Sequence, residues 1–135
     1  MRHLRIFAIV LLVAATQFAC KKSPSAVLRA MQEAAREGDT ERFASYFTED
    51  SQPFAKALMA VYRTQAVAGG DASKALQVLA DSTVVEERVE NQRALLTVTT
   101  GKDVESRSVL VFRKDDKDGQ WKLDIEETEH RNIDQ

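Results

Sequence analysis

Alternating hydrophobic and polar positions between residues 84 and 125 predict a β-sheet. Three turn signals divide this stretch into four runs. The turn signals are Glu90-Asn91-Gln92, Gly101-Lys102 and the tract 115–119. The last run, residues 121–125, places Trp, Leu and Ile on one face and Lys and Asp on the other. We therefore expect an antiparallel four-stranded meander with one buried face and one solvated face.

Apolar residues at helical spacing come before this sheet and supply a cover for its buried face. Each predicted helix begins at a residue that commonly caps or opens helices. The four expected helices cover residues 24–37, 40–48, 53–68 and 71–80, opened by Ser23-Pro24, Asp39, Pro53 and Asp71 respectively. Helices followed by strands predict an α+β fold class, in which N-terminal helices pack on a curved four-stranded antiparallel meander.

Residues 1–19 have the anatomy of an export signal. Two arginines precede an apolar run over residues 6–15, and the small residue Ala19 ends the segment. A retained transmembrane helix is the alternative. However, residues 4–19 are interrupted by polar side chains and fall short of the roughly 20 residues that a bilayer core requires. We expect residues 1–19 to be a signal peptide.

The single cysteine of the chain, Cys20, directly follows this signal. The pair Ala19-Cys20 resembles the end of a bacterial lipoprotein signal, although Gln17 and Phe18 depart from the usual branched and small residues. The resemblance implies that Cys20 is acylated and that residues 20–24 form a short linker. It also implies a lipid anchor in the bacterial cell envelope, at the outer membrane rather than the inner one, with the domain facing the periplasm. The alternative is a cysteine that is buried or discarded with the signal.

Charge and cysteine content narrow the classes of function. One cysteine excludes an internal disulfide, so the fold must rely on its core. Removing residues 1–19 removes two arginines and no acid. Lys plus Arg then falls from 19 to 17 against 21 acids, and the net charge moves from -2 to -4. A mildly acidic domain with dispersed charge is not expected to bind nucleic acid.

Three sequence phrases resemble the nuclear transport factor 2-like family. They are Ala35-Arg36-Glu37-Gly38-Asp39-Thr40-Glu41-Arg42-Phe43 between two helices, Ala94-Leu95-Leu96-Thr97-Val98 in the meander, and Trp121-Lys122-Leu123 near its end. The resemblance covers residues 25–126 and leaves residues 127–135 as a polar tail. It implies a cone of curved strands roofed by helices. Some members are isomerases or cyclases in which a pocket acid works with Tyr or His, so the fold alone does not specify a function.

Small polar residues on the buried face of the sheet are the candidate ligand contacts. Strand alternation places Leu96 and Val98 beside Ser106 and Ser108. Hydroxyls among large apolar side chains leave room for a ligand, and Tyr62 on the third helix adds another hydroxyl. In the alternative interpretation, the two serines face water or lie under a closely packed helix, and the tyrosine is a core residue.

Glu87 is the candidate catalytic residue. In one register Val85 and Val89 face the core, and Glu87 turns into the same face, where a carboxylate can act as a general base. The opposite register buries Val84 and sends Glu87 to water. Edge strands also commonly carry an inward charge or a bulge that prevents edge-to-edge pairing.

The remaining polar candidates have ordinary structural interpretations. Tyr46 lies in a helical apolar stripe and is expected in the core, and His130 lies in the polar tail. The acidic tract 115–118 lacks the spacing of an EF-hand loop and is interpreted as a hairpin turn, not a calcium site. We expect neither a metal nor a cofactor.

The sequence thus predicts an envelope lipoprotein whose domain binds a small apolar ligand or an envelope protein. An isomerase-type or cyclase-type enzyme is the second hypothesis. The third is a homodimer that pairs through the outer face of the sheet, where Leu95, Val109 and Val111 form an apolar patch among polar residues.

Overall fold

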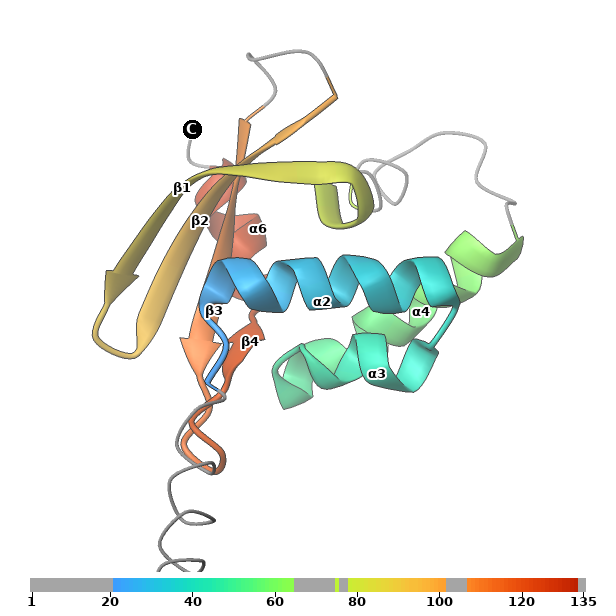
Figure 1. Ribbon diagram of the computed structural model, residues 1–135, viewed down its shortest axis with the longest axis horizontal. Helices are drawn as coiled ribbons and strands as arrows, with labels where there is room; N and C mark the ends of the chain where they lie inside the picture. The colour runs from blue at the N-terminus through green and yellow to red at the C-terminus, as the bar shows by residue number, and fades with distance from the viewer. Residues whose placement is uncertain (1–20, 65–74, 76–77, 102–106, 134–135) are drawn as a thin grey trace, which may run out of the picture.

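A four-stranded antiparallel sheet in the order β1-β2-β3-β4 organises the computed structural model, which describes residues 21–64, 75, 78–101 and 107–133 (Figure 1). The strands are β1 Ser82–Glu90, β2 Arg93–Thr100, β3 Arg107–Lys114 and β4 Trp121–Leu123. The predicted meander is confirmed. Its first turn contains Asn91 at φ 54°, a left-handed conformation that asparagine adopts more readily than most residues.

The helices before the sheet begin where their capping residues predict. They are α2 Pro24–Glu37, α3 Thr40–Ser45, the 3₁₀-helix η2 Glu49–Ser51 and α4 Gln52–Thr64. The side chain of Ser23 accepts a hydrogen bond from the Ala26 N–H, and Gly38 ends α2 in the left-handed conformation. Of the fourth predicted helix, residues 75 and 78–80 are described, and they are helical, as is residue 81.

The second helix is shorter than predicted because the chain after Ser45 pairs with β4. The carbonyl of Tyr46 accepts a hydrogen bond from the Leu123 N–H at 2.8 Å, and the Thr48 N–H donates to the Leu123 carbonyl at 3.0 Å. These contacts hold Phe47 beside β4 in an isolated parallel bridge. The prediction of a helix over residues 40–48 is therefore wrong in its last turn.

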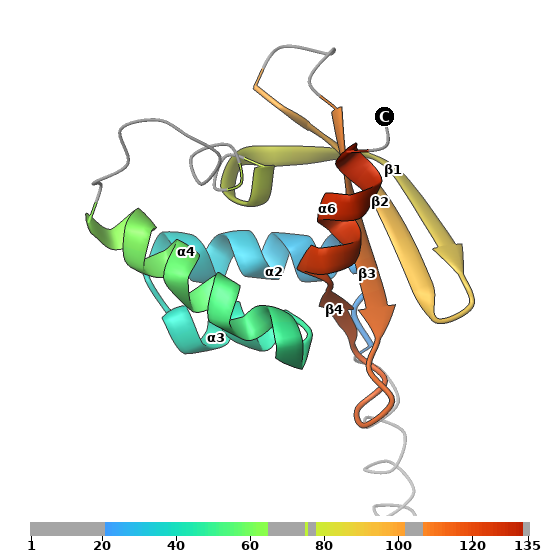
Figure 2. The same cartoon turned by 180° about the vertical axis from the view of Figure 1, so that it is seen from behind.

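The core lies between the helices and one face of the sheet, as the α+β prediction requires. Figures 1 and 2 show α2, α3 and α4 on the same side of the strands. The apolar stripe of α2 and the inner face of β2 and β3 are fully buried together. Their buried side chains are Val27, Leu28, Met31, Ala34, Ala35, Ala94, Leu96, Val98, Leu110 and Phe112.

A C-terminal helix, α6 Ile125–Ile133, replaces most of the predicted polar tail. The chain leaves β4 at Leu123, so the last predicted strand is also two residues too long. The Asp124 carboxylate accepts a hydrogen bond from the Glu127 N–H at 3.1 Å, and the Asp124 carbonyl accepts from the Thr128 N–H. Asp124 is thus the N-cap of α6. The interpretation of residues 127–135 as a tail outside the domain is wrong for residues up to 133.

Side chains of α6 pair with the part of β3 that β4 is too short to reach. The Val111 N–H donates to Oγ1 of Thr128 at 2.9 Å, and the Asp124 N–H donates to the Val111 carbonyl. The side-chain amide of Asn132 accepts from the Val109 N–H at 3.1 Å and donates to its carbonyl at 3.0 Å. A helix therefore supplies the hydrogen bonds that a longer fourth strand would make.

The proposed dimer patch on the outer face is largely covered within one chain. Leu95 is 8% exposed and Val111 is 0% exposed, while Val109 is half-buried. Figure 2 shows α6 lying across β3 on this side. The prediction of an exposed apolar patch is wrong, because residues 125–133 form a helix beside β3 and are not a polar tail.

Candidate functional site

A pocket of about 650 Å³ opens between α4, the helical residues 75, 78 and 79, β3 and α6. This volume lies in the range of small-molecule sites. Its apolar wall is formed by Phe54, Ala75, Val78, Leu79, Leu110 and Ile125. Its polar groups are Ser108, Thr128, Glu129 and Asn132, three of which belong to α6. The pocket is therefore mainly apolar, with a polar side formed by the C-terminal helix and one strand residue.

Strand geometry positions the floor of the pocket. Ser108 pairs with Val98 and Leu110 pairs with Leu96, so all four side chains point to the inner face. The small Ser108 side chain is half-buried where the neighbouring Leu110 fills the core. The step from leucine to serine along one face opens the space that a larger residue would occupy.

Most polar groups on the α6 side of the pocket already have partners. Oγ1 of Thr128 donates to the Asp124 carbonyl at 2.6 Å and accepts from Val111, and Nδ2 of Asn132 donates to the Val109 and Thr128 carbonyls. Within the described part of the chain, the Ser108 hydroxyl and the Glu129 carboxylate make no such contact and are open to a ligand.

The predicted ligand contacts are only partly brought together. Ser108 lines the pocket. It pairs with Val98, and Leu96 pairs with Leu110. The pairing of β2 with β3 is therefore shifted by two residues from the prediction, in which Leu96 and Val98 lie beside Ser106 and Ser108. Ser106 lies outside the described residues. Tyr62 is 37% exposed on α4 and does not line the pocket. Of the three candidates, Ser108 is thus the one with pocket geometry.

Glu87 lies on the inner side of β1, but at the surface. An extra residue between Val84 and Glu86 shifts the register, so that Val84 pairs with Val98 and Glu87 pairs with Leu96. Val84 therefore faces the core, as in one of the two predicted registers, and Glu87 lies on the inner side of the strand, as in the other. The exposed Glu87 carboxylate accepts a hydrogen bond from the Ser25 N–H at the start of α2 at 3.1 Å. This contact stabilises a helix N-terminus and places Glu87 outside the pocket.

The other polar candidates have structural surroundings. Tyr46 is half-buried, with Nζ of Lys22 5.5 Å from its ring centroid, and His130 is exposed on α6. Asp115 and Asp118 accept hydrogen bonds from amides within the β3–β4 turn, which confirms the hairpin interpretation. Among the described residues, no group of three or more His, Cys, Asp or Glu side chains is placed to hold a metal.

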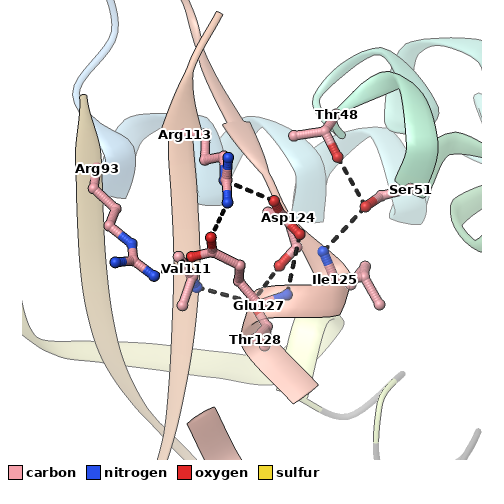
Figure 3. A network of polar contacts seen from close by, with 9 residues as sticks. All are labelled: Thr48, Ser51, Arg93, Val111, Arg113, Asp124, Ile125, Glu127 and Thr128. Atoms are coloured by element: carbon pink, nitrogen blue, oxygen red, sulfur yellow. Dashed lines mark hydrogen bonds and ion pairs between the residues drawn. The ribbon is translucent and has the colours of Figure 1, made fainter. Parts of the chain in front are cut away.

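A charge cluster that sequence reasoning missed fixes α6 to the sheet (Figure 3). Arg93 and Arg113 are direct cross-strand partners, and the Glu127 carboxylate forms ion pairs with both. Nε of Arg113 lies 2.9 Å from Oδ2 of Asp124. Like charges side by side on a sheet destabilise it, so Glu127 and the N-cap residue Asp124 offset an otherwise unfavourable pair.

The signal for this cluster is present in the sequence. Asp124 is followed three residues later by Glu127, which is the spacing of a capping box, directly after a predicted strand. The Ile125 N–H also donates to Oγ of Ser51, which accepts from Oγ1 of Thr48 at 2.8 Å. Figure 3 shows these contacts tying the start of α6 to the helical layer as well as to the sheet.

The chain matches no known family, and no curated protein or solved structure is significantly similar to it. The resemblances to bacterial lipoproteins and to the nuclear transport factor 2-like family therefore depend on the sequence phrases alone. In the described ranges, none of the helices has the length and apolar character needed to cross a bilayer.

Proposed function

We propose that this protein is an acylated lipoprotein of the bacterial cell envelope whose domain, a nuclear transport factor 2-like cone, binds a small apolar ligand. The pocket of about 650 Å³ carries the proposal, because it combines an apolar wall with a few polar groups on one side. The export signal and Cys20 support the location. The order of helices and strands, with the helices on one face of the meander, supports the cone.

The pocket lining defines the chemical class of the ligand. Phe54, Val78, Leu79 and Leu110 suit an apolar body. The Ser108 hydroxyl donates or accepts a hydrogen bond, and the exposed Glu129 carboxylate accepts one. The best-fitting ligand is an apolar molecule with a hydroxyl or amine at one end.

Binding fits this pocket better than catalysis does. An isomerase or cyclase on this fold needs a carboxylate within the cavity, shielded from water. Glu87 caps a helix outside the pocket, and Glu129 is exposed on α6. Neither carboxylate has the surroundings of a desolvated base.

Filling the pocket is expected to weaken the binding of an apolar probe. Ser108→Phe adds a ring to the half-buried floor, and overpacking by that group is expected to weaken binding of 1-N-phenylnaphthylamine about tenfold or more. Fluorescence titration measures the effect. Thr83→Phe, which adds the same ring at an exposed position of β1, is the matched control. Undiminished probe binding by a folded Ser108→Phe protein would show that the probe binds elsewhere.

Removing the acylation site tests the location. Cys20→Ser lacks the thiol that forms the thioether with lipid, so the full chain expressed in bacteria should lose its acyl mass. Intact-mass measurement of the wild-type and variant proteins reports this change. A wild-type protein that carries residues 1–19 and no acyl mass would support the retained-helix alternative instead.

A further inference from the structure

The chain is held against the domain from Lys21 onward. A β-carbon at Gly119 would lie 3.2 Å from Nζ of Lys21, so this side chain lies directly over the turn between β3 and β4. Nζ of Lys22 lies 5.5 Å from the ring centroid of Tyr46, and α2 begins at Pro24. Figure 1 shows the start of the described chain beside the β3–β4 hairpin. No flexible spacer separates Lys21 from the folded domain.

Lysine side chains gather at this end of the molecule, which we call the docking end and define by Lys21, Lys22, Lys114 and Lys117. Nζ of Lys114 lies 5.8 Å from the ring centroid of the half-buried Trp121. The Lys117 side chain is 85% exposed at the hairpin turn, with Nζ 3.9 Å from Oε2 of the exposed Glu49. A tryptophan beside lysines is a common arrangement at a membrane surface.

Two of the three acids of the same hairpin, Asp115 and Asp118, make hydrogen bonds within it, and the third, Asp116, is exposed. Oδ1 of Asp115 accepts from the Lys117 N–H at 2.7 Å, and Oδ1 of Asp118 accepts from the Gln120 N–H at 2.9 Å. Oδ2 of Asp118 also lies 3.6 Å from Nζ of Lys122. These carboxylates hold the turn, beside which the Lys117 side chain is exposed. The side chains of Lys21, Lys22 and Lys114 lie on the surface of the domain around it.

We infer that the docking end lies on anionic phospholipid headgroups and fixes the orientation of the domain. The inference rests on the acylation of Cys20 proposed above. Consecutive Cα atoms are about 3.8 Å apart. An acylated Cys20 therefore brings Lys21, and with it the β3–β4 turn, to headgroup depth. The C-terminal end of α6 and the β2–β3 end of the sheet lie at the opposite end of the molecule (Figures 1 and 2).

A single-thiol label measures this orientation in the full, membrane-purified protein. Because acylation consumes the thiol of Cys20, the introduced cysteine provides the single free thiol for the label. Asp116→Cys places a bimane label at the hairpin turn, and Arg131→Cys places the same label on the exposed face of α6. In phosphatidylethanolamine vesicles containing phosphatidylglycerol and a headgroup-nitroxide lipid, the label at position 116 should be quenched much more strongly. Intact mass of the same samples reports the acyl group.

The contribution of the lysines to the orientation is tested with a double lysine variant and a control variant that loses the same charge elsewhere. Lys21→Gln with Lys117→Gln should lower the ratio of docked to undocked orientations about fivefold per lysine at an anionic surface. This change should disappear in vesicles without phosphatidylglycerol. Arg36→Gln with Arg63→Gln removes the same charge from the far ends of α2 and α4 and should leave the quenching unchanged.

The outcomes separate the two proposals. Acylated protein with equal quenching at positions 116 and 131 overturns the docking inference and leaves the lipid anchor standing. Acylated protein whose quenching is unaffected by the lysine pair overturns the role of headgroup charge. An absent acyl mass overturns the anchor, and the docking inference with it.

Discussion

Replacing Phe112 by alanine is expected to lower the free energy of unfolding by about 3–5 kcal/mol, the usual cost of removing a buried ring. Phe112 is 0% exposed and pairs with Ala94 on one side and with Leu123 on the other. It therefore lies where the sheet, the helical layer and the β4 contact meet. The small neighbour Ala94 cannot fill the space, so a cavity remains between the layers.

Urea unfolding followed by circular dichroism measures this loss. Val89→Ala is the matched control, because Val89 is 54% exposed on β1 and its truncation should change stability by less than about 0.5 kcal/mol. Phe112→Leu should fall between the two. If Phe112→Ala were as stable as the control variant, the packing of this core would be wrong.

The elements that sequence reasoning predicted correctly have local signals. Ser23-Pro24 and Gly38 bracket α2 because a cap and a left-handed glycine act within one turn of the chain. The meander followed from strand alternation and turn residues, whose effects are also local. The α+β arrangement then follows, since the apolar helix stripes and the apolar sheet face must cover one another.

The errors occur where distant contacts override local pattern. The bulge after Val84 adds one residue to β1, and no local signal distinguishes it from the two regular registers. Tyr46 extends an apolar helical stripe, but its backbone pairs with Leu123 on the far end of the chain. The C-terminal helix has a mostly polar sequence, so its capping spacing was the only strong signal, and it was missed.

The same distinction explains how much of the candidate site was predictable. Ser108 could be assigned to the inner face from alternation alone. The pocket itself requires walls from α4, β3 and α6, which are far apart in sequence. Without α6, neither the polar side of the pocket nor the burial of Leu95 and Val111 could be inferred. The failure to predict α6 therefore explains two errors: the polar side of the pocket was not predicted, and a dimer patch was predicted on residues that are buried.

Replacing Asp124 by alanine is expected to destabilise the domain by about 2 kcal/mol, because one side chain makes two kinds of contact. It caps α6 through the Glu127 N–H, and it pairs with Nε of Arg113 at 2.9 Å. The Asp124 side chain is only 14% exposed, so solvent screens this pair less than an exposed one. Loosening α6 also moves one wall of the pocket, so binding of 1-N-phenylnaphthylamine should weaken together with stability.

Asp124→Asn separates the cap from the ion pair. Its amide oxygen still accepts from the Glu127 N–H, but its charge is gone, so about half of the loss should remain. Glu126→Ala, at an exposed position one residue into α6, is the control for helix propensity and should be nearly neutral. Hydrogen exchange at the Val109 and Val111 amides locates the effect, because these two amides donate to α6 side chains. Faster exchange in Asp124→Ala at these amides, with unchanged exchange in the β1–β2 ladder, is the expected pattern. Equal stability of Asp124→Ala and Glu126→Ala would instead mean that α6 is held by apolar contacts, with the charge cluster contributing nothing measurable.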